Sequence, residues 1–295
     1  MGIFSTSGVS RYSIKWRRII HKPLTALFGS TLKEKITLLR NGFIPNGRST
    51  IYAATHVFYD DVASVCCCLE HSAYLLIGIE GADNTPVFSE RLALNLNGAI
   101  VVNRAEKKSR SESLNTMVSI LNKQGNVLIF PEGGWNLTPN LLIQKLHWGV
   151  LRAAEQTNAN VVPIAVDLVE NTCYVIIGEN FNYSAYDNIQ EATEGLTDTM
   201  ATLVWELICM KQPLQRHNLD DTYWLKHIQA QYSRMPQKDQ AKEELYFYRP
   251  KGEVSLGEVL AEMYGLEYKS MATDYEQHKR VQSLIDNWTK PVGFL

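Results

Sequence analysis

Short apolar runs of strand length alternate with helix-like stretches between residues 48 and 182, and this alternation constrains the fold more than any other feature of the chain. It is typical of a sheet whose strands are joined by crossover helices. The expected strands are residues 50–54, 74–79, 98–102, 126–130, 161–166 and 173–177. The expected helices between them are residues 61–70, 87–96, 111–124 and 147–158. The sequence therefore predicts an α/β domain with a mixed, largely parallel central sheet flanked by helices.

The stretch after the third expected strand shows the periodicity on which the helices rest. Its apolar residues recur every three or four positions and form one stripe toward the sheet: Leu114, Met117, Val118 and Leu121. Ser111 is the expected N-terminal cap of this helix. Residues 187–210 predict one longer helix that returns to cover the sheet.

The chain divides into three segments on these patterns. Residues 1–47 are a basic N-terminal segment, residues 48–210 are the α/β core, and residues 211–295 are a C-terminal extension. The extension is more polar than the core and contains no motif that indicates a role.

The N-terminal segment is strongly basic. Residues 1–40 hold eight Lys or Arg and one acid, Glu34, which gives them a charge of +7 and leaves −9 for the rest of a chain of net charge −2. Apolar residues lie at helical spacing on one face: Trp16, Ile20, Leu24, Leu27 and Phe28. Pro23 is expected to interrupt this helix or to begin a second one. The helix either binds an anionic membrane surface or packs on the protein's own core with its charges in water.

Composition excludes several classes of protein. With 45% hydrophobic and 20% charged residues the bulk of the chain is neither disordered nor fibrous. No apolar stretch reaches the roughly 18 to 20 residues of a membrane span, and no secretory signal is expected.

The consecutive Cys66, Cys67 and Cys68 make a poor disulfide framework, which favours a reducing, cytoplasmic setting. No metal site, dinucleotide fingerprint or nucleic-acid-binding motif is present, so we expect neither a tightly bound cofactor nor a nucleic-acid partner.

The first candidate site follows the strand 50–54. His56 stands at the end of that strand, and Asp61 follows five residues later. A turn between them would let the carboxylate accept a proton from one imidazole nitrogen and leave the other nitrogen as a base. Asp60 is the rival partner. Alternatively, His56 is a satisfied polar residue and both aspartates cap the next helix.

The second candidate site ends the strand 126–130. Pro131 ends strand pairing, and the glycines Gly133 and Gly134 let the backbone turn sharply, so that Glu132 is presented at the sheet edge where ligands of α/β proteins bind. The alternative is a tight connection whose glutamate is merely solvated.

The third candidate site is the run from Gly98 to Arg104, in which an apolar strand delivers Arg104 to its carboxyl end. A guanidinium group suits bidentate capture of a phosphate or carboxylate. A basic loop of this kind is otherwise a solvated surface.

In this order and spacing, the segments resemble the 1-acylglycerol-3-phosphate acyltransferases, also called lysophospholipid or glycerolipid acyltransferases. The family's His and Asp separated by four residues fall on His56 and Asp61, and its Gly, apolar strand and Arg fall on Gly98 and Arg104. Its Phe-Pro-Glu-Gly motif is Phe130, Pro131, Glu132 and Gly133, followed by the small residue Gly134. Its apolar strand with an internal proline fits Val161 to Ile164, with Pro163 as the proline. The resemblance covers roughly residues 30–210 and makes residues 48–210 the acyltransferase catalytic core.

The resemblance implies transfer of a fatty acyl group from a thioester, acyl-CoA or acyl-ACP, to a hydroxyl of a glycerol-phosphate-type lysolipid. It implies that His56 is the general base and that Asp61 orients it. Arg104 would hold the acceptor phosphate, and Glu132 with the amides around Gly133 and Gly134 would order its glycerol end. Acyl carrier protein would be a partner if acyl-ACP is the donor. A lysolipid acceptor lies in the bilayer, so the resemblance also favours a cytoplasmic enzyme peripherally associated with the membrane.

Two departures from the family pattern concern the acceptor. Many members follow the third motif with Thr or Ser and then an Arg that helps bind phosphate, whereas this chain has Gly134, Trp135 and Asn136. Val62 follows Asp61 where a small polar residue is usual. The departures leave open an amine or a non-phosphate alcohol as the acceptor, and a third hypothesis is a non-catalytic lipid-binding scaffold of the same fold.

Overall fold

Seven strands form one sheet in the computed structural model, which describes residues 11–58, 60–78, 98–103, 106–134, 136, 142–169 and 171–210. The strands are β1 (Lys35–Asn41), β2 (Thr50–Ala54), β3 (Tyr74–Gly78), β4 (Ala99–Val102), β5 (Val127–Ile129), β6 (Asn160–Val169) and β7 (Thr172–Ile177). Their order across the sheet is β1-β7-β6-β2-β5-β3-β4.

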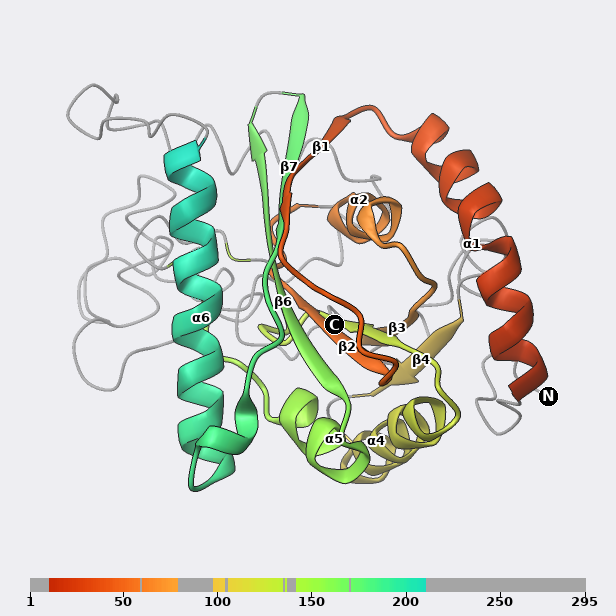
Figure 1. The fold of residues 1–295 in the computed structure, drawn as a ribbon, viewed down its shortest axis with the longest axis vertical. Helices are drawn as coiled ribbons and strands as arrows, with labels where there is room; N and C mark the ends of the chain where they lie inside the picture. The colour runs from red at the N-terminus through yellow and green to blue at the C-terminus, as the bar shows by residue number, and fades with distance from the viewer. Residues whose placement is uncertain are drawn as a thin grey trace, which may run out of the picture.

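The sheet is mixed and largely parallel, as predicted (Figure 1). β2 pairs in parallel with both β5 and β6, and β3 pairs in parallel with β4 and β5. β6 and β7 form an antiparallel pair, and β1 lies parallel to β7. The strands before each crossover helix therefore end at one common edge of the sheet, where the sequence places its motifs.

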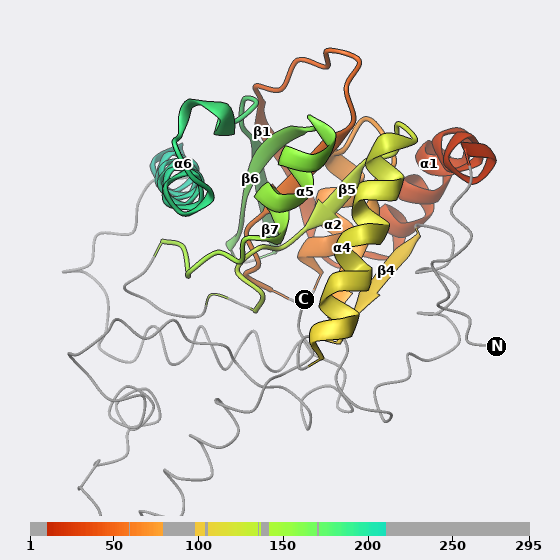
Figure 2. The ribbon, with the colours of Figure 1, turned by 90° about the horizontal axis from the view of Figure 1, so that it is seen from below.

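Helices cover both faces of the sheet. The helices are α1 (Arg11–Thr31), α2 (Asp61–Cys68), α4 (Lys107–Asn122), α5 (Gly149–Thr157) and α6 (Ile189–Met210), with a short 3-10 turn, η2, at Tyr183–Ala185. α1 and α2 pack on one side, whereas α4, α5 and α6 pack on the other (Figures 1 and 2). Along β2, Ile51 and Ala53 belong to the core under α4 to α6, while Tyr52 and Ala54 belong to the core under α2. Burial on both faces explains why the central strands read as continuous apolar runs.

The sequence did not predict β1. This strand comes from the segment 1–47 that we set apart from the core, yet it pairs with β7 along its length. It is an edge strand with most of its residues exposed or half-buried, so it lacks the apolar run that identified the central strands. The sheet, and with it the structural core, therefore begins at Lys35 and not at residue 48.

α4 begins earlier than predicted. Its first residue is Lys107, preceded by Glu106, so Ser111 lies in the helix and is not its cap. The hydroxyl that organises this helix start belongs to Ser109, which accepts the Asn103 N–H at 2.8 Å. The helix expected at 87–96 and the extension 211–295 lie outside the described residues.

α1 is one continuous helix of 21 residues that passes through Pro23, contrary to the interruption we expected. Leu24 is buried against the protein, whereas Trp16 and Leu27 of the same predicted face are exposed. The helix packs on α2, and His21 Nε2 lies 2.9 Å from the carbonyl oxygen of Leu69, the residue after α2. Among the residues that the structure describes, every helix is too short or too polar to be a membrane-spanning segment.

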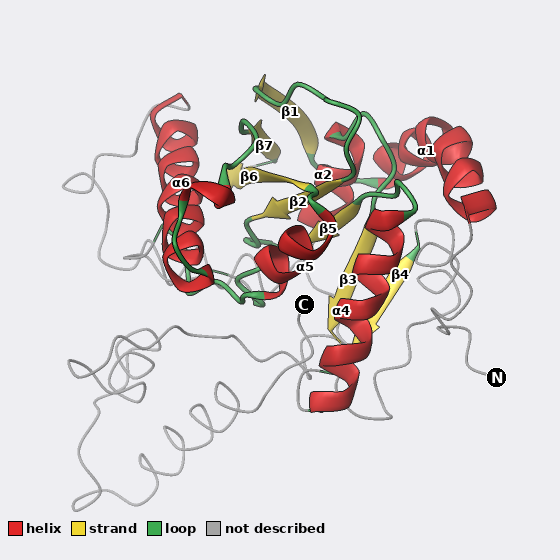
Figure 3. Ribbon diagram, turned by 60° about the horizontal axis from the view of Figure 1, so that its bottom comes forward, coloured by secondary structure: helices red, strands yellow, loops and turns green. Residues whose placement is uncertain are grey.

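Pro163 lies within β6, which is an interior strand of the sheet (Figure 3). Its carbonyl oxygen accepts the N–H of Gly178, the residue directly after β7, at 2.9 Å. Because the N and C=O of one strand residue point to the same side, the missing N–H faces the segment after β7 and not β2. The pairing of β6 with β2 thus loses no donor, which is how an interior strand accommodates a proline.

Candidate active site

The register between β2 and β5 brings the first and third motifs together. Ala53 lies opposite Ile129 in this parallel pair. His56 follows Ala53 by three residues, and Glu132 follows Ile129 by three residues. Both side chains therefore emerge from the same edge of the sheet, where open α/β folds place their ligand sites.

His56 and Asp61 form a close pair, as the spacing predicted. His56 Nδ1 lies 3.0 Å from Asp61 Oδ1 and 2.9 Å from Asp61 Oδ2. His56 is 4% exposed and Asp61 is fully buried. An ionised carboxylate only accepts hydrogen bonds, so the proton of a neutral imidazole sits on Nδ1 and the lone pair on Nε2. The arrangement can thus supply a fixed base.

The turn between the two residues is closed by the same carboxylate. Asp61 Oδ2 accepts the Val57 N–H at 2.7 Å and the Phe58 N–H at 3.1 Å. Asp60, the rival partner, instead precedes α2 and its carbonyl accepts the Ser64 N–H at 3.0 Å. Asp61 lies in the first turn of α2, where the helix dipole favours a negative charge.

Glu132 lies beside this pair and is fully buried. Its Oε1 accepts the His56 N–H at 3.2 Å, and its Oε2 accepts the Gln144 N–H at 2.8 Å. Burial raises the pKa of Glu132 to about 8, the two backbone hydrogen bonds oppose that rise, and the charge of Asp61 adds to it. The glutamate is therefore not the solvated residue of a plain surface turn.

The rest of the third motif is buried with Glu132. The Phe130 ring packs against the His56 imidazole with 4.6 Å between centroids. Gly133 has φ of 78°, a left-handed conformation that favours glycine, and its N–H donates to the Phe130 carbonyl at 3.1 Å. Pro131 and Gly134 are also buried. The N–H groups of Gly133 and of residues 56–58 thus already donate hydrogen bonds to oxygens within the site. We therefore assign no oxyanion donor among them.

Three further residues help to hold the site, and we had assigned none of them a role from the sequence. The Asn136 N–H donates to the His56 carbonyl at 2.8 Å, and Gln144 reaches Glu132 through its N–H. The Thr55 hydroxyl accepts the Val166 N–H at 2.9 Å and so ties the end of β2 to β6. The Asn136 and Gln144 contacts use backbone groups that any non-proline residue supplies, so no sequence signal marks them.

A family model described as Acyltransferase matches residues 35–167, the span that holds β1 to most of β6 and includes His56, Asp61 and Glu132. The chain therefore contains an acyltransferase domain at residues 35–167. It is accordingly an acyltransferase enzyme.

The fold of this acyltransferase is similar to that of the 1-acyl-sn-glycerophosphate (LPA) acyltransferase PlsC from Thermotoga maritima. The two structures superpose with a TM-score of 0.54 and share 16% sequence identity, over 68% of this chain and 84% of that chain. At this identity the likeness establishes the fold alone. No curated protein matches the sequence.

The second motif of the acyltransferase is described in part, because Arg104 lies outside the described residues. Gly98 precedes β4 with φ of 82°, and a Cβ atom there would lie 2.5 Å from Cδ1 of Tyr74. Glycine is therefore needed at this position for conformation and for space. Within the described residues, no group of three or more His, Cys, Asp or Glu side chains is placed to hold a metal ion.

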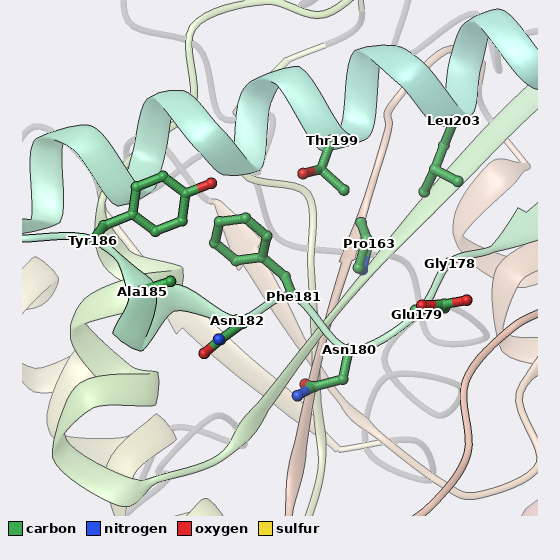
Figure 4. A pocket seen from close by; sticks show the side chains of 10 residues that line it. All are labelled: Pro163, Gly178, Glu179, Asn180, Phe181, Asn182, Ala185, Tyr186, Thr199 and Leu203. Carbon is green, nitrogen blue, oxygen red and sulfur yellow. The ribbon is translucent and has the colours of Figure 1, made fainter.

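A hollow of about 360 Å³ lies between α6 and the segment that follows β7, lined by Pro163, Phe181 and Leu203 among others (Figure 4). Pro163 is in register with Ala53, which faces the α4 to α6 side of the sheet. His56 packs on Phe130, which belongs to the core under α2. The hollow is thus on the opposite face of the sheet from the His56 site of the acyltransferase.

Proposed function

We propose that this acyltransferase moves a fatty acyl group from an acyl thioester to the hydroxyl of a glycerol-phosphate-type lysolipid, with His56 as the general base. The pairing of His56 Nδ1 with both oxygens of Asp61 carries the proposal, because it fixes the tautomer that a base requires. The likeness in fold to an enzyme named as a 1-acyl-sn-glycerophosphate acyltransferase supports the acceptor class.

The reaction proceeds by direct transfer. Nε2 of His56 takes the proton of the acceptor hydroxyl while the hydroxyl oxygen attacks the carbonyl carbon of the thioester. Asp61 stabilises the imidazolium that forms. Collapse of the tetrahedral intermediate breaks the C–S bond, and the imidazolium returns its proton to the departing thiolate. The products are the acyl ester and the free thiol, so no covalent enzyme intermediate is required.

Replacement of the base tests this mechanism. A positioned base typically contributes about 10²- to 10⁴-fold in rate, so His56→Ala should reduce kcat by at least that lower factor. The variant should keep the circular dichroism spectrum of the wild type. If folded His56→Ala retains more than about a tenth of wild-type acyl transfer, His56 is not the general base.

The phosphate of the acceptor is assigned to Arg104. Arg104→Ala should raise the KM for a phosphate-bearing lysolipid far more than the KM for a neutral alcohol. Equal effects would favour an amine or non-phosphate alcohol acceptor, which the sequence Gly134, Trp135, Asn136 permits. A screen of acceptors with a labelled acyl thioester, read by mass spectrometry of the lipids formed, identifies the product directly. Parallel reactions with acyl-CoA and acyl-ACP identify the donor.

The acyltransferase works as a peripheral enzyme on an anionic membrane surface, and α1 supplies the contact. Three large apolar side chains of α1 are exposed, Trp16 at 53%, Ile19 at 69% and Leu27 at 60%. Lys15 and Arg18 are exposed on the same helix. Exposed apolar side chains beside basic groups are the pattern of helices that lie in a membrane interface.

Vesicle sedimentation tests this surface. Changing Trp16, Ile19 and Leu27 together to Ser should reduce binding to vesicles that contain an anionic phospholipid. The matched control is Trp205→Ser on α6, since Trp205 is 56% exposed on the other side of the sheet. Unchanged binding of the triple variant, or an equal loss in the control, would contradict the assignment of the membrane contact to α1.

A further inference from the structure

We propose that Glu132 is a positioning residue for His56 and not a contact of the acceptor: its carboxyl group and the Asn136 amide hold the His56 peptide groups on either side of the imidazole. This inference rests on the proposed role of His56 as the base. It replaces the acceptor contact that the family resemblance implied for Glu132.

Both oxygens of Glu132 are directed at backbone groups. Oε1 lies 3.2 Å from the His56 N atom and Oε2 lies 2.8 Å from the Gln144 N atom. The residue is 0% exposed, so neither oxygen faces an open surface. Each oxygen has a further lone pair, but a glycerol hydroxyl could reach it only if the groups that bury Glu132 moved apart.

Two buried carboxyl groups share the backbone around the imidazole. The N–H groups of three consecutive residues, His56, Val57 and Phe58, all donate to side-chain oxygens. The His56 N–H donates to Glu132, and the Val57 and Phe58 N–H groups donate to Asp61. The carbonyl of His56 completes the set by accepting the Asn136 N–H. The backbone that carries the imidazole is therefore fixed before and after its Cα atom.

Glu132 also links His56 to the residues that follow the third motif. Gln144, which bonds the second oxygen of Glu132, lies in the segment 142–148, and the N–H of His147 from that segment donates to the Pro131 carbonyl at 2.8 Å. Glu132 thus joins three parts of the site: the end of β2, the turn after β5 and the segment before α5. Loss of its oxygens would free the His56 peptide group to rotate, and a displacement of about 1 Å can cost a reaction about 100-fold.

Substitution of Glu132 separates positioning from substrate binding. Glu132→Gln keeps the shape but offers one acceptor oxygen in place of two, and Glu132→Leu offers none. Positioning predicts that kcat falls about 10- to 100-fold in the Gln variant and further in the Leu variant, while KM for acceptor and donor stays within about twofold. A rise of about tenfold or more in the acceptor KM with little change in kcat would overturn the proposal.

A spectroscopic measurement without substrates tests the inference independently of catalysis. The Nδ1 proton of His56, held by Asp61, should give a low-field proton resonance in the wild type that His56→Ala lacks. Positioning predicts that this resonance shifts or broadens in Glu132→Gln and Glu132→Leu. If it is unchanged in both variants, Glu132 does not position the imidazole. Failure of the proposed function would appear differently, as activity in His56→Ala.

A matched control excludes a general loss of stability. Leu207→Ala removes a fully buried side chain from α6, which packs on the opposite face of the sheet from α2. It should lower the midpoint of thermal unfolding but leave kcat per folded molecule and the Nδ1 proton resonance unchanged. If Leu207→Ala reproduces the kinetic and spectroscopic changes of Glu132→Gln, those changes reflect lost stability and the positioning role is rejected.

Discussion

Asp61 braces His56 from the first turn of a helix, with Asp61 Oδ2 2.9 Å from His56 Nδ1. The same oxygen also accepts two backbone N–H groups of the intervening turn. One carboxylate therefore shapes the loop and orients the imidazole. The geometry of the proposed base depends on a charge that is held by three donors, His56 Nδ1 and the N–H groups of Val57 and Phe58. This relationship makes the pair sensitive to changes that keep shape but remove charge.

Asp61→Asn tests that sensitivity. The asparagine side chain has one acceptor oxygen, and its NH₂ group would favour the imidazole tautomer with the proton on Nε2. By analogy with the Asp of a serine-protease triad, we expect kcat to fall by roughly 10³- to 10⁴-fold with the fold retained. Steady-state kinetics at saturating substrate measures the loss. The control is Asp60→Asn, the rival carboxylate at the residue before α2, which should retain most activity. Equal losses in the two variants would contradict the assignment.

Gly98→Ala should destabilise the fold. The added Cβ atom would lie 2.5 Å from Cδ1 of Tyr74, at a φ of 82° that L side chains rarely adopt. We expect a loss of about 1–3 kcal/mol in the free energy of unfolding, measured by urea denaturation. Gly149→Ala is the control, because nothing lies within 4 Å of its added Cβ atom and it begins α5. That variant should be neutral or slightly more stable.

The buried Glu132 makes stability depend on pH. Its pKa is raised to about 8 from the ordinary 4.5, so between these values the folded protein holds a proton that the unfolded chain has released. The free energy of unfolding therefore decreases as pH rises through this window, by up to about 1.4 kcal/mol per unit. Urea unfolding at several pH values should show this slope in the wild type, and Glu132→Gln should reduce it. An identical slope in both proteins would show that another group is responsible.

Alkylation should distinguish the cysteines. All five are free thiols, and Cys209 alone among them is exposed. Burial raises the pKa of Cys66 and Cys68 to about 12 and also raises the pKa of Cys67 and Cys173. Because the thiolate is the reactive form, iodoacetamide at neutral pH should modify Cys209 first, as peptide mass spectrometry would detect. Rapid modification of Cys66 in the folded protein would contradict the packing of α2.

Local patterns explain the predictions that the structure confirms. The alternation of apolar runs predicted six of the seven strands, and the spacing of His56 and Asp61 predicted their contact. Both depend on residues close in the sequence, where periodicity and turn chemistry act directly. Where that signal is weak the prediction was wrong: β1 is an exposed edge strand, and α1 continues through Pro23 because tertiary contacts outweigh the local penalty.

The sequence by itself determined the α/β class and the edge of the sheet that carries the motifs, and it singled out His56 and Asp61, which we propose as the base and its carboxylate. Only the tertiary structure decided which groups Glu132 contacts and which face of α1 is exposed. His56 and Glu132 are 76 residues apart, and their contact depends on the register between β2 and β5. That register is selected by packing of whole strands and helices, so no pattern within either motif encodes it.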